Sequence, residues 1–106
     1  GELNGHRFLN ESSVKEIYAP HTQLENEYGY NGYNLWVTSD LYKEKGFGDG
    51  GLWSGGGYEG THFWIDPKRD FVGLIMTQMF ETPKAGHGRD NEIRGEVYRQ
   101  IFKNED

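Results

Sequence analysis

Two segments of the sequence carry residue types that suit nucleophilic chemistry. Ser12-Ser13-Val14-Lys15 places a serine three positions before a lysine. At this spacing both side chains lie on one face of a helix, where they could serve as nucleophile and base. The second segment is Trp53-Ser54-Gly55-Gly56-Gly57-Tyr58. Its small residues would let a substrate approach the backbone closely.

Other residues allow further sites, each with a simpler structural interpretation. His62, Asp66 and Ser54 could form a catalytic triad, but a strand histidine at a sheet surface is the commoner outcome. His62, Asp66 and Glu59 could ligate a metal, although no recognised ligand spacing supports this. The charged stretches 43–45 and 68–69 are interpreted as solvated loop charges.

The aromatic residues motivate an alternative function. Trp36, Trp53, Tyr58 and Trp64 could form a platform on which a sugar stacks, as in an aromatic-rich, non-enzymatic carbohydrate-binding module. At least half of them are expected in the core, because aromatic side chains supply much of this chain's apolar area.

Composition limits the size of the protein and its partners. The 106 residues suffice for one small domain, and a hydrophobic fraction of 34% is low for a chain that buries its own core. We therefore expect this piece to pack against other protein. A net charge of −6 argues against nucleic acid and membrane surfaces as partners. The apolar stretch around Phe71–Met76 is too short to cross a bilayer, and the absence of cysteine excludes disulfides.

Hydrophobic periodicity and turn residues predict an α+β fold. It consists of an antiparallel sheet, made of a three-stranded C-terminal meander plus one preceding strand, packed against a C-terminal helix. The predicted elements are a helix over Leu9–Ile17 with Asn10 as N-cap, strands over Tyr33–Thr38, Leu52–Gly57, Gly60–Asp66 and Phe71–Met79, and a helix over Asp90–Phe102 capped by Asp90 or Asn91. The Phe71–Met79 run is apolar enough to be covered on both faces. Tyr28–Tyr33 is predicted as a turn and Ser39–Gly51 as a loop.

One stretch resembles a known family. Gly60–Pro67 followed by Asp70–Gln78 resembles the C-terminal strand pair of β-lactamase-like serine hydrolases, which include class C β-lactamases, penicillin-binding proteins and related esterases. Weaker pieces before and after it follow in the family's order, so the resemblance covers residues 1–106. It implies that the chain is the C-terminal segment of a single, larger β-lactamase-like domain.

In that family a serine of a Ser-x-x-Lys motif attacks a carbonyl, and a Lys-Thr-Gly-like strand donates a backbone N–H to the oxyanion hole. Two alignments place this strand here. One puts the triplet at Gly55–Gly57 with the N–H from Tyr58, and the other puts it at Trp53–Gly55 with the N–H from Gly56. Neither supplies the family's lysine, and tryptophan at the first position favours an esterase-like member.

The resemblance also implies what is absent from this chain. Ser12 and Lys15 lie too close to the glycine strand to be the family's catalytic pair, and they fit the polar side of an N-terminal helix. The nucleophile is therefore expected on an N-terminal portion, in the same chain or a separate one, and this chain alone is expected to be inactive. The implied substrate is a small ester or amide, no cofactor is implied, and family habit favours a periplasmic or secreted setting.

Overall fold

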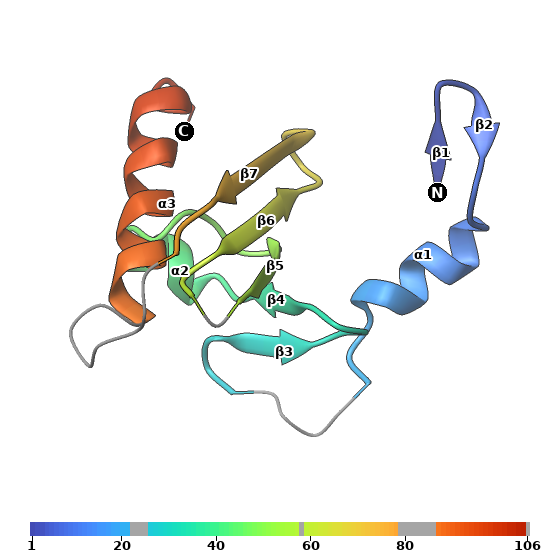
Figure 1. Ribbon diagram of the computed structural model, residues 1–106, viewed down its shortest axis with the longest axis horizontal. Helices are drawn as coiled ribbons and strands as arrows, with labels where there is room; N and C mark the ends of the chain where they lie inside the picture. The colour runs from blue at the N-terminus through green and yellow to red at the C-terminus, as the bar shows by residue number, and fades with distance from the viewer. Residues whose placement is uncertain (22–25, 58, 79–86, 106) are drawn as a thin grey trace.

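The computed structural model describes residues 1–21, 26–57, 59–78 and 87–105, with the backbone alone at 87 and 88. The elements in chain order are β1 (Glu2–Leu3), β2 (His6–Arg7), α1 (Glu11–Tyr18), β3 (Gly29–Asn31), β4 (Trp36–Thr38), α2 (Leu41–Glu44), β5 (Trp53–Gly56), β6 (His62–Asp66), β7 (Phe71–Ile75) and α3 (His87–Ile101). Strands β3 to β7 form one antiparallel sheet in sequence order, and α3 lies across one face of it (Figure 1). The predicted α+β class, the C-terminal meander and the terminal helix are confirmed.

The sheet has five strands where four were predicted. The additional strand is β3, which lies in the glycine-aromatic segment predicted as a turn; there Tyr30 pairs with Val37 of β4. The predicted loop Ser39–Gly51 contains the short helix α2. An N-terminal hairpin was also missed. It turns at Asn4 and Gly5, which both have positive φ, so the Asn-Gly pair was a turn signal that the prediction did not use.

The core lies between the sheet and α3. Leu52, Trp64 and Tyr98 are its buried centre. Trp64 lies directly opposite Gly73 on β7, and a Cβ added at Gly73 would come within 2.1 Å of the Trp64 indole. Glycine at this position therefore makes the space that the largest core side chain occupies.

The predicted buried face of α3 is confirmed in part, since three of its five apolar positions pack in the core: Val97, Tyr98 and Phe102. The other two, Ile93 and Ile101, are 37% and 58% exposed. Arg94, which the prediction did not include, is buried. The helix also begins at His87, so Asp90 and Asn91 both lie inside it and the prediction that one of them is the N-cap is wrong. Hydrophobic spacing gave only part of this face, because the chain also buries a polar arginine beneath the helix.

The face of β7 that points away from α3 is exposed within the described chain. Val72, Leu74 and Met76 are 65%, 62% and 78% exposed, whereas Phe71 and Ile75 pack towards α3. The described residues cover this strand on the α3 face only, so the predicted cover of the other face, by helices or by other protein, is not supplied by them. The apolar pattern that prompted it remains as an uncovered hydrophobic surface.

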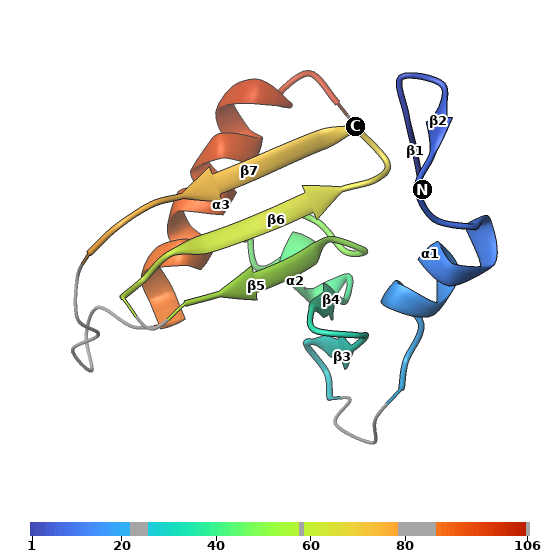
Figure 2. The ribbon, with the colours of Figure 1, turned by 45° about the vertical axis from the view of Figure 1, so that its right-hand side comes forward.

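Helix α1 contacts the sheet near its C-terminal end. The Tyr18 ring stacks on Trp53 with centroids 4.7 Å apart, and the Tyr30 hydroxyl donates to the Tyr18 carbonyl oxygen. Asn10 is the N-cap residue, as predicted, but its side chain forms no capping hydrogen bond. Ala19 is extended ahead of Pro20, as the proline requires. Figure 2 shows the β1–β2 hairpin and the start of α1 standing away from the sheet.

Candidate functional site

The glycine-rich segment forms strand β5 in the middle of the sheet. On one side β5 pairs with β6 along its whole length, from Trp53 opposite Ile65 to Gly56 opposite His62. On the other side it pairs with β4 only at Trp53 and Ser54. Beyond Ser54 none of the described residues pairs with the β4 side of the strand, so within this part of the chain the last two residues of β5 have an open edge.

The backbone N–H of Gly56 points towards this open edge. In an antiparallel strand successive residues direct their N–H and C=O groups alternately to the two sides. The Gly57 N–H donates to Thr61 across the β6 side, and the Leu52 carbonyl accepts from Thr38 on the β4 side. Gly56 lies four residues after Leu52, an even number, so its backbone groups point to the same side of the strand. Its N–H is therefore directed away from β6.

The two glycines at the end of β5 have different roles. A Cβ at Gly55 would lie 2.7 Å from the Phe63 ring, so glycine is needed there for packing. At Gly56 the nearest atoms to an added Cβ are 3.6 Å away, which is ordinary contact. Gly56 is also exposed. The Gly56 backbone is therefore accessible to solvent.

Ser54 is not placed to act as a nucleophile. Its side chain is on the α3 face, the residue is buried, and its hydroxyl donates to the Trp36 carbonyl oxygen at 3.3 Å. Its position between two paired strands gives it a structural role, which is to hold β5 against β4.

A polar cluster lies beside the open end of β5. His62, directly opposite Gly56, accepts a hydrogen bond on Nε2 from Arg94 Nη1 at 2.9 Å. Its Nδ1 lies 3.4 Å from Asp90 Oδ2. Arg94 also donates to the Phe47 carbonyl oxygen, and its guanidinium lies 5.1 Å from the centre of the Tyr42 ring. The buried arginine therefore joins α3, β6 and the segment after α2.

These contacts favour the neutral imidazole. Burial is the main cause that lowers the pKa of His62; Asp90 opposes this effect and Arg94 adds to it. The Nε2 atom faces a guanidinium N–H and must accept, so the proton belongs on Nδ1, facing Asp90. His62 thus acts as a fixed acceptor that orients Arg94, and its interactions explain its position without a catalytic role.

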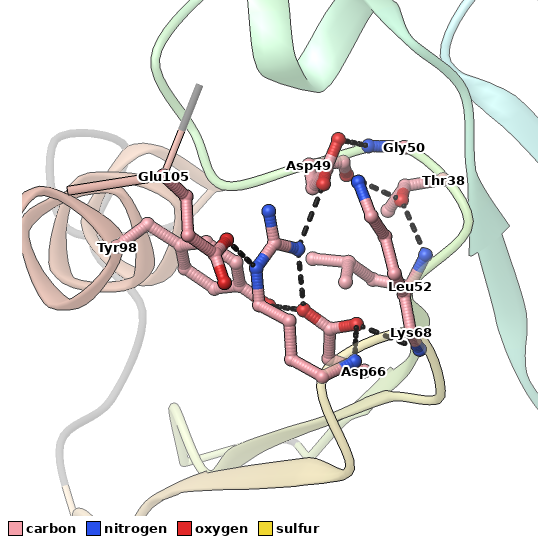
Figure 3. Close-up of polar contacts among 9 residues, drawn as sticks. Thr38, Asp49, Gly50, Leu52, Asp66, Lys68, Tyr98 and Glu105 are labelled. Carbon is pink, nitrogen blue, oxygen red and sulfur yellow. Dashed lines mark hydrogen bonds and ion pairs between the residues drawn. The ribbon is translucent and has the colours of Figure 1, made fainter. Parts of the chain in front are cut away.

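Asp66 lies at the opposite end of β6, in a second polar network (Figure 3). Arg69 Nη1 donates to Asp66 Oδ2 at 2.9 Å and to Asp49 Oδ2 at 2.8 Å. The Tyr98 hydroxyl donates to the same Asp66 oxygen at 2.6 Å. The other Asp66 oxygen accepts the backbone N–H groups of Lys68 and Arg69. This network fixes the β6–β7 turn to α3.

The network shifts the acidity of its members. Burial raises the pKa of Asp66, but the hydrogen bonds from Tyr98 and Arg69 outweigh it, and the net shift is downward. Burial and the hydrogen bond to Asp66 raise the pKa of Tyr98. Asp66 is therefore a stably ionised anchor that accepts four hydrogen bonds.

The possible triad and metal site are not assembled. His62 is engaged with Arg94 and Asp90, Asp66 with Arg69 and Tyr98, and Ser54 with Trp36. Within residues 1–21, 26–57, 59–78 and 87–105, no group of three or more histidine, cysteine, aspartate or glutamate side chains is placed to hold a metal ion. Ser12 and Lys15 are both exposed on α1, in keeping with the interpretation of that segment as a polar helix surface.

The aromatic residues do not form a common platform. Trp53 and Trp64 point to opposite faces of the sheet, because Trp64 pairs with Ser54 and not with Trp53. Trp64 is 2% exposed and belongs to the core. Trp53 is covered by Tyr18. Tyr58, which was included in the platform and in one alignment of the glycine strand, lies outside the described residues.

Sequence reasoning missed the buried arginines. Arg69, interpreted as a solvated loop charge, has a side chain only 11% exposed, and Arg94 is 1% exposed. A signal existed for Arg94, which is followed by Gly95 in a helix. A Cβ at Gly95 would lie 2.1 Å from the Gly46 carbonyl oxygen, so this glycine marks the face on which α3 is closely packed.

In the part of the chain that the structure describes, no helix has the length and apolar character needed to cross a membrane. Comparisons with protein-family models, with curated proteins and with solved structures gave no significant match.

Proposed function

We propose that this chain is the C-terminal part of a serine hydrolase that acts through an acyl-enzyme on a small ester or amide. In this proposal β5 lines the active site, and the Gly56 N–H is one donor of the oxyanion hole. The serine nucleophile and its lysine belong to an N-terminal portion, in the same polypeptide or a separate one. An esterase is favoured over a β-lactamase because neither alignment of β5 supplies a lysine in the triplet.

The observation that carries the proposal is the open edge of β5. An oxyanion hole needs fixed N–H groups aimed at a position where substrate charge develops. Gly56 offers such a group, because the residue is exposed and its N–H is directed away from β6 and is not paired with β4.

The exposed apolar surface supports the need for a further portion of protein. Val72, Leu74 and Met76 form a solvent-facing row on a strand whose outer edge is unpaired among the described residues. Ile101 adds exposed apolar area on α3. Monomeric proteins rarely leave contiguous apolar surface of this kind uncovered, which fits a chain that is one part of a larger domain.

A serine-reactive fluorophosphonate probe tests the proposal. The complete protein carrying this segment is expected to take up one probe molecule, on a serine of a Ser-x-x-Lys motif outside residues 1–106. The 106-residue chain alone is expected to take up none. Intact mass and peptide mapping locate the label. Labelling of Ser12, or ester turnover by the isolated chain that Ser12→Ala abolishes, would contradict it.

Substitutions in β5 test the donor itself. Gly56→Pro removes the N–H, whereas Gly56→Ala keeps it and adds a Cβ that meets only ordinary contacts. In the complete protein, kcat for an activated ester should fall about 10²- to 10³-fold in Gly56→Pro and by far less in Gly56→Ala. If Tyr58→Pro lowers the rate and Gly56→Pro does not, the other alignment is correct.

A further inference from the structure

A pocket of about 320 Å³ lies between α3, the segment after α2 and the β6–β7 turn, away from the open end of β5. Five of its eleven lining residues are basic, and one is acidic. The basic residues are Lys43, Lys68, Arg69, Arg99 and Lys103. The whole chain has a net charge of −6. The fold therefore gathers nearly half of its eleven lysines and arginines around one concave site, from segments up to 60 positions apart.

The three lysines of this pocket have no ion-pair partner among the described residues. Within the described residues, Lys43, Lys68 and Lys103 form no ion pair, and all three residues are exposed. The sequence interpretation treated Lys43 and Lys68 as separate solvated charges. The structure instead places them around the same cavity, and the carboxylate that also lines it, Glu105, is paired with Arg69. An anion bound there would have lysine charges available to pair with.

The pocket already accepts one oxyanion from the chain itself. Glu105 Oε2 accepts a hydrogen bond from Arg69 Nε, although the Glu105 side chain remains 47% exposed. The Arg69 guanidinium is held in place by Asp49 and Asp66 and by the rings of Tyr98 and Phe102, with its central carbon 5.3 and 5.1 Å from their centroids. A bound anion could therefore displace the exposed Glu105 carboxylate from the Arg69 guanidinium, which other contacts hold in place.

We propose that this pocket binds a phosphate group, either free or as the monoester of a small organic molecule. The ammonium groups of Lys43, Lys68 and Lys103 hold its oxygens, and Glu105 competes with it for Arg69. Lysine is a common phosphate ligand, and it binds phosphate as a point charge. Three lysine ammonium groups match the charge of a phosphate dianion better than they match the single charge of a carboxylate. The volume is at the lower end for small-molecule pockets, so it accommodates phosphate and a small organic group.

Calorimetric titration of the complete protein at constant ionic strength tests this site. One titrant is inorganic phosphate and the other is glycerol phosphate. Lys68→Gln and Lys103→Gln should each weaken phosphate binding about tenfold. The matched control is Lys15→Gln, because Lys15 is an exposed lysine on α1, which lies on the other side of the sheet from α3 (Figure 1). This control should leave the affinity unchanged.

The role of Glu105 gives an effect in the opposite direction. Glu105→Gln should tighten phosphate binding about threefold, because it removes both a competitor for Arg69 and a nearby negative charge. Glu11→Gln on α1 makes the same change in net charge and should have no effect. Tighter binding of glycerol phosphate than of inorganic phosphate would identify an organic monoester as the ligand, and the reverse would identify free phosphate.

Two results would overturn the proposal. The first is the absence of saturable binding of either titrant up to about 10 mM, which corresponds to negligible affinity. The second is an equal loss of affinity in Lys15→Gln and Lys68→Gln, since that pattern reports overall charge and not a site. All of these variants change exposed side chains, so folding is preserved, and their circular dichroism spectra should be superimposable.

Discussion

The Tyr98 hydroxyl donates a 2.6 Å hydrogen bond to Asp66 Oδ2, and this contact ties the last turn of α3 to the end of β6. Asp66 is 1% exposed and Tyr98 is 8% exposed, so water cannot readily replace either partner. The carboxylate is buried but accepts hydrogen bonds from two side chains and two backbone groups. A buried charge is tolerated in this core because its acceptor capacity is filled.

Removing the hydroxyl should therefore destabilise the fold. Tyr98→Phe keeps the ring and its packing but deprives Asp66 of one donor, which should lower the free energy of unfolding by about 1–3 kcal/mol. Tyr33→Phe is the matched control, because Tyr33 is 57% exposed and should change stability by less than about 0.5 kcal/mol. Urea unfolding followed by tryptophan fluorescence compares them. Equal effects in the two variants would show that the Tyr98 hydrogen bond adds no stability.

The space under Trp64 gives a second stability prediction. Gly73→Ala places a Cβ about 2.1 Å from the indole, so Trp64 or the strand must shift. Overpacking of this kind should cost about 1–3 kcal/mol. Gly56→Ala is the control, since its Cβ meets nothing closer than 3.6 Å. Thermal unfolding of both variants measures the difference. A Gly73→Ala protein as stable as the control would mean that the core is loosely packed at β7.

The pH dependence of stability should report His62. Its pKa is lower in the folded state than the ordinary value of about 6.5, chiefly because of burial. The unfolded chain therefore takes up a proton first as the pH falls. The stabilisation is present above about pH 6.5 and decreases as the pH falls towards the folded-state pKa.

His62→Gln should reduce the loss of stability between about pH 7 and pH 5, a window set by the ordinary histidine pKa. His6→Gln is the control, since His6 lies in the exposed β1–β2 hairpin. Denaturant titrations across this range give the slopes. If the two variants keep the same slope as the unsubstituted protein, His62 is not the group responsible. Asp66, whose folded-state pKa is also lowered, contributes with the same sign at more acidic pH.

The exposed face of β7 should respond differently in the isolated chain and in the complete protein. Leu74→Gln changes a side chain that is 62% exposed, so it should alter the stability of the 106-residue chain by less than about 0.5 kcal/mol. If an N-terminal portion covers this face, the same change should destabilise the complete protein by about 2 kcal/mol or more. Unfolding midpoints of both forms measure this. Equal, small effects in both would mean that the face stays in solvent.

The meander and the last helix could be predicted because their signals are local. The aromatic and β-branched residues of 62–66, the turn that begins at Asp66-Pro67 and the apolar run from Phe71 are contiguous in the sequence. The contacts of Arg94 are not local: it donates to Phe47, which is 47 positions away. Hydrophobic spacing carries no information on such a partner, so Ile93 and Ile101 were assigned to the buried face of α3.

The candidate site could likewise be predicted only where the signal is local in the sequence. The glycines of 55–57 could be identified from their residue type. The direction of the Gly56 N–H could not, because it depends on the register of three strands and on where β4 leaves β5. The lysine pocket was also beyond sequence reasoning, since Lys43, Lys68 and Lys103 lie in three separate segments and converge only in the folded chain.

Helix α1 contacts the sheet only near its C-terminal end. Protection of backbone amides from hydrogen exchange should therefore differ between this end of the molecule and the sheet. The hydrogen bonds of β5 and β6 lie in the middle of the sheet above the core, whereas the start of α1 and the β1–β2 hairpin contact the remainder sparsely (Figure 2). Local opening of weakly packed segments requires less free energy than global unfolding. Deuterium should therefore enter residues 2–14 within the earliest exchange times and should reach the amides of Trp64 and Ile65 only when the whole sheet unfolds.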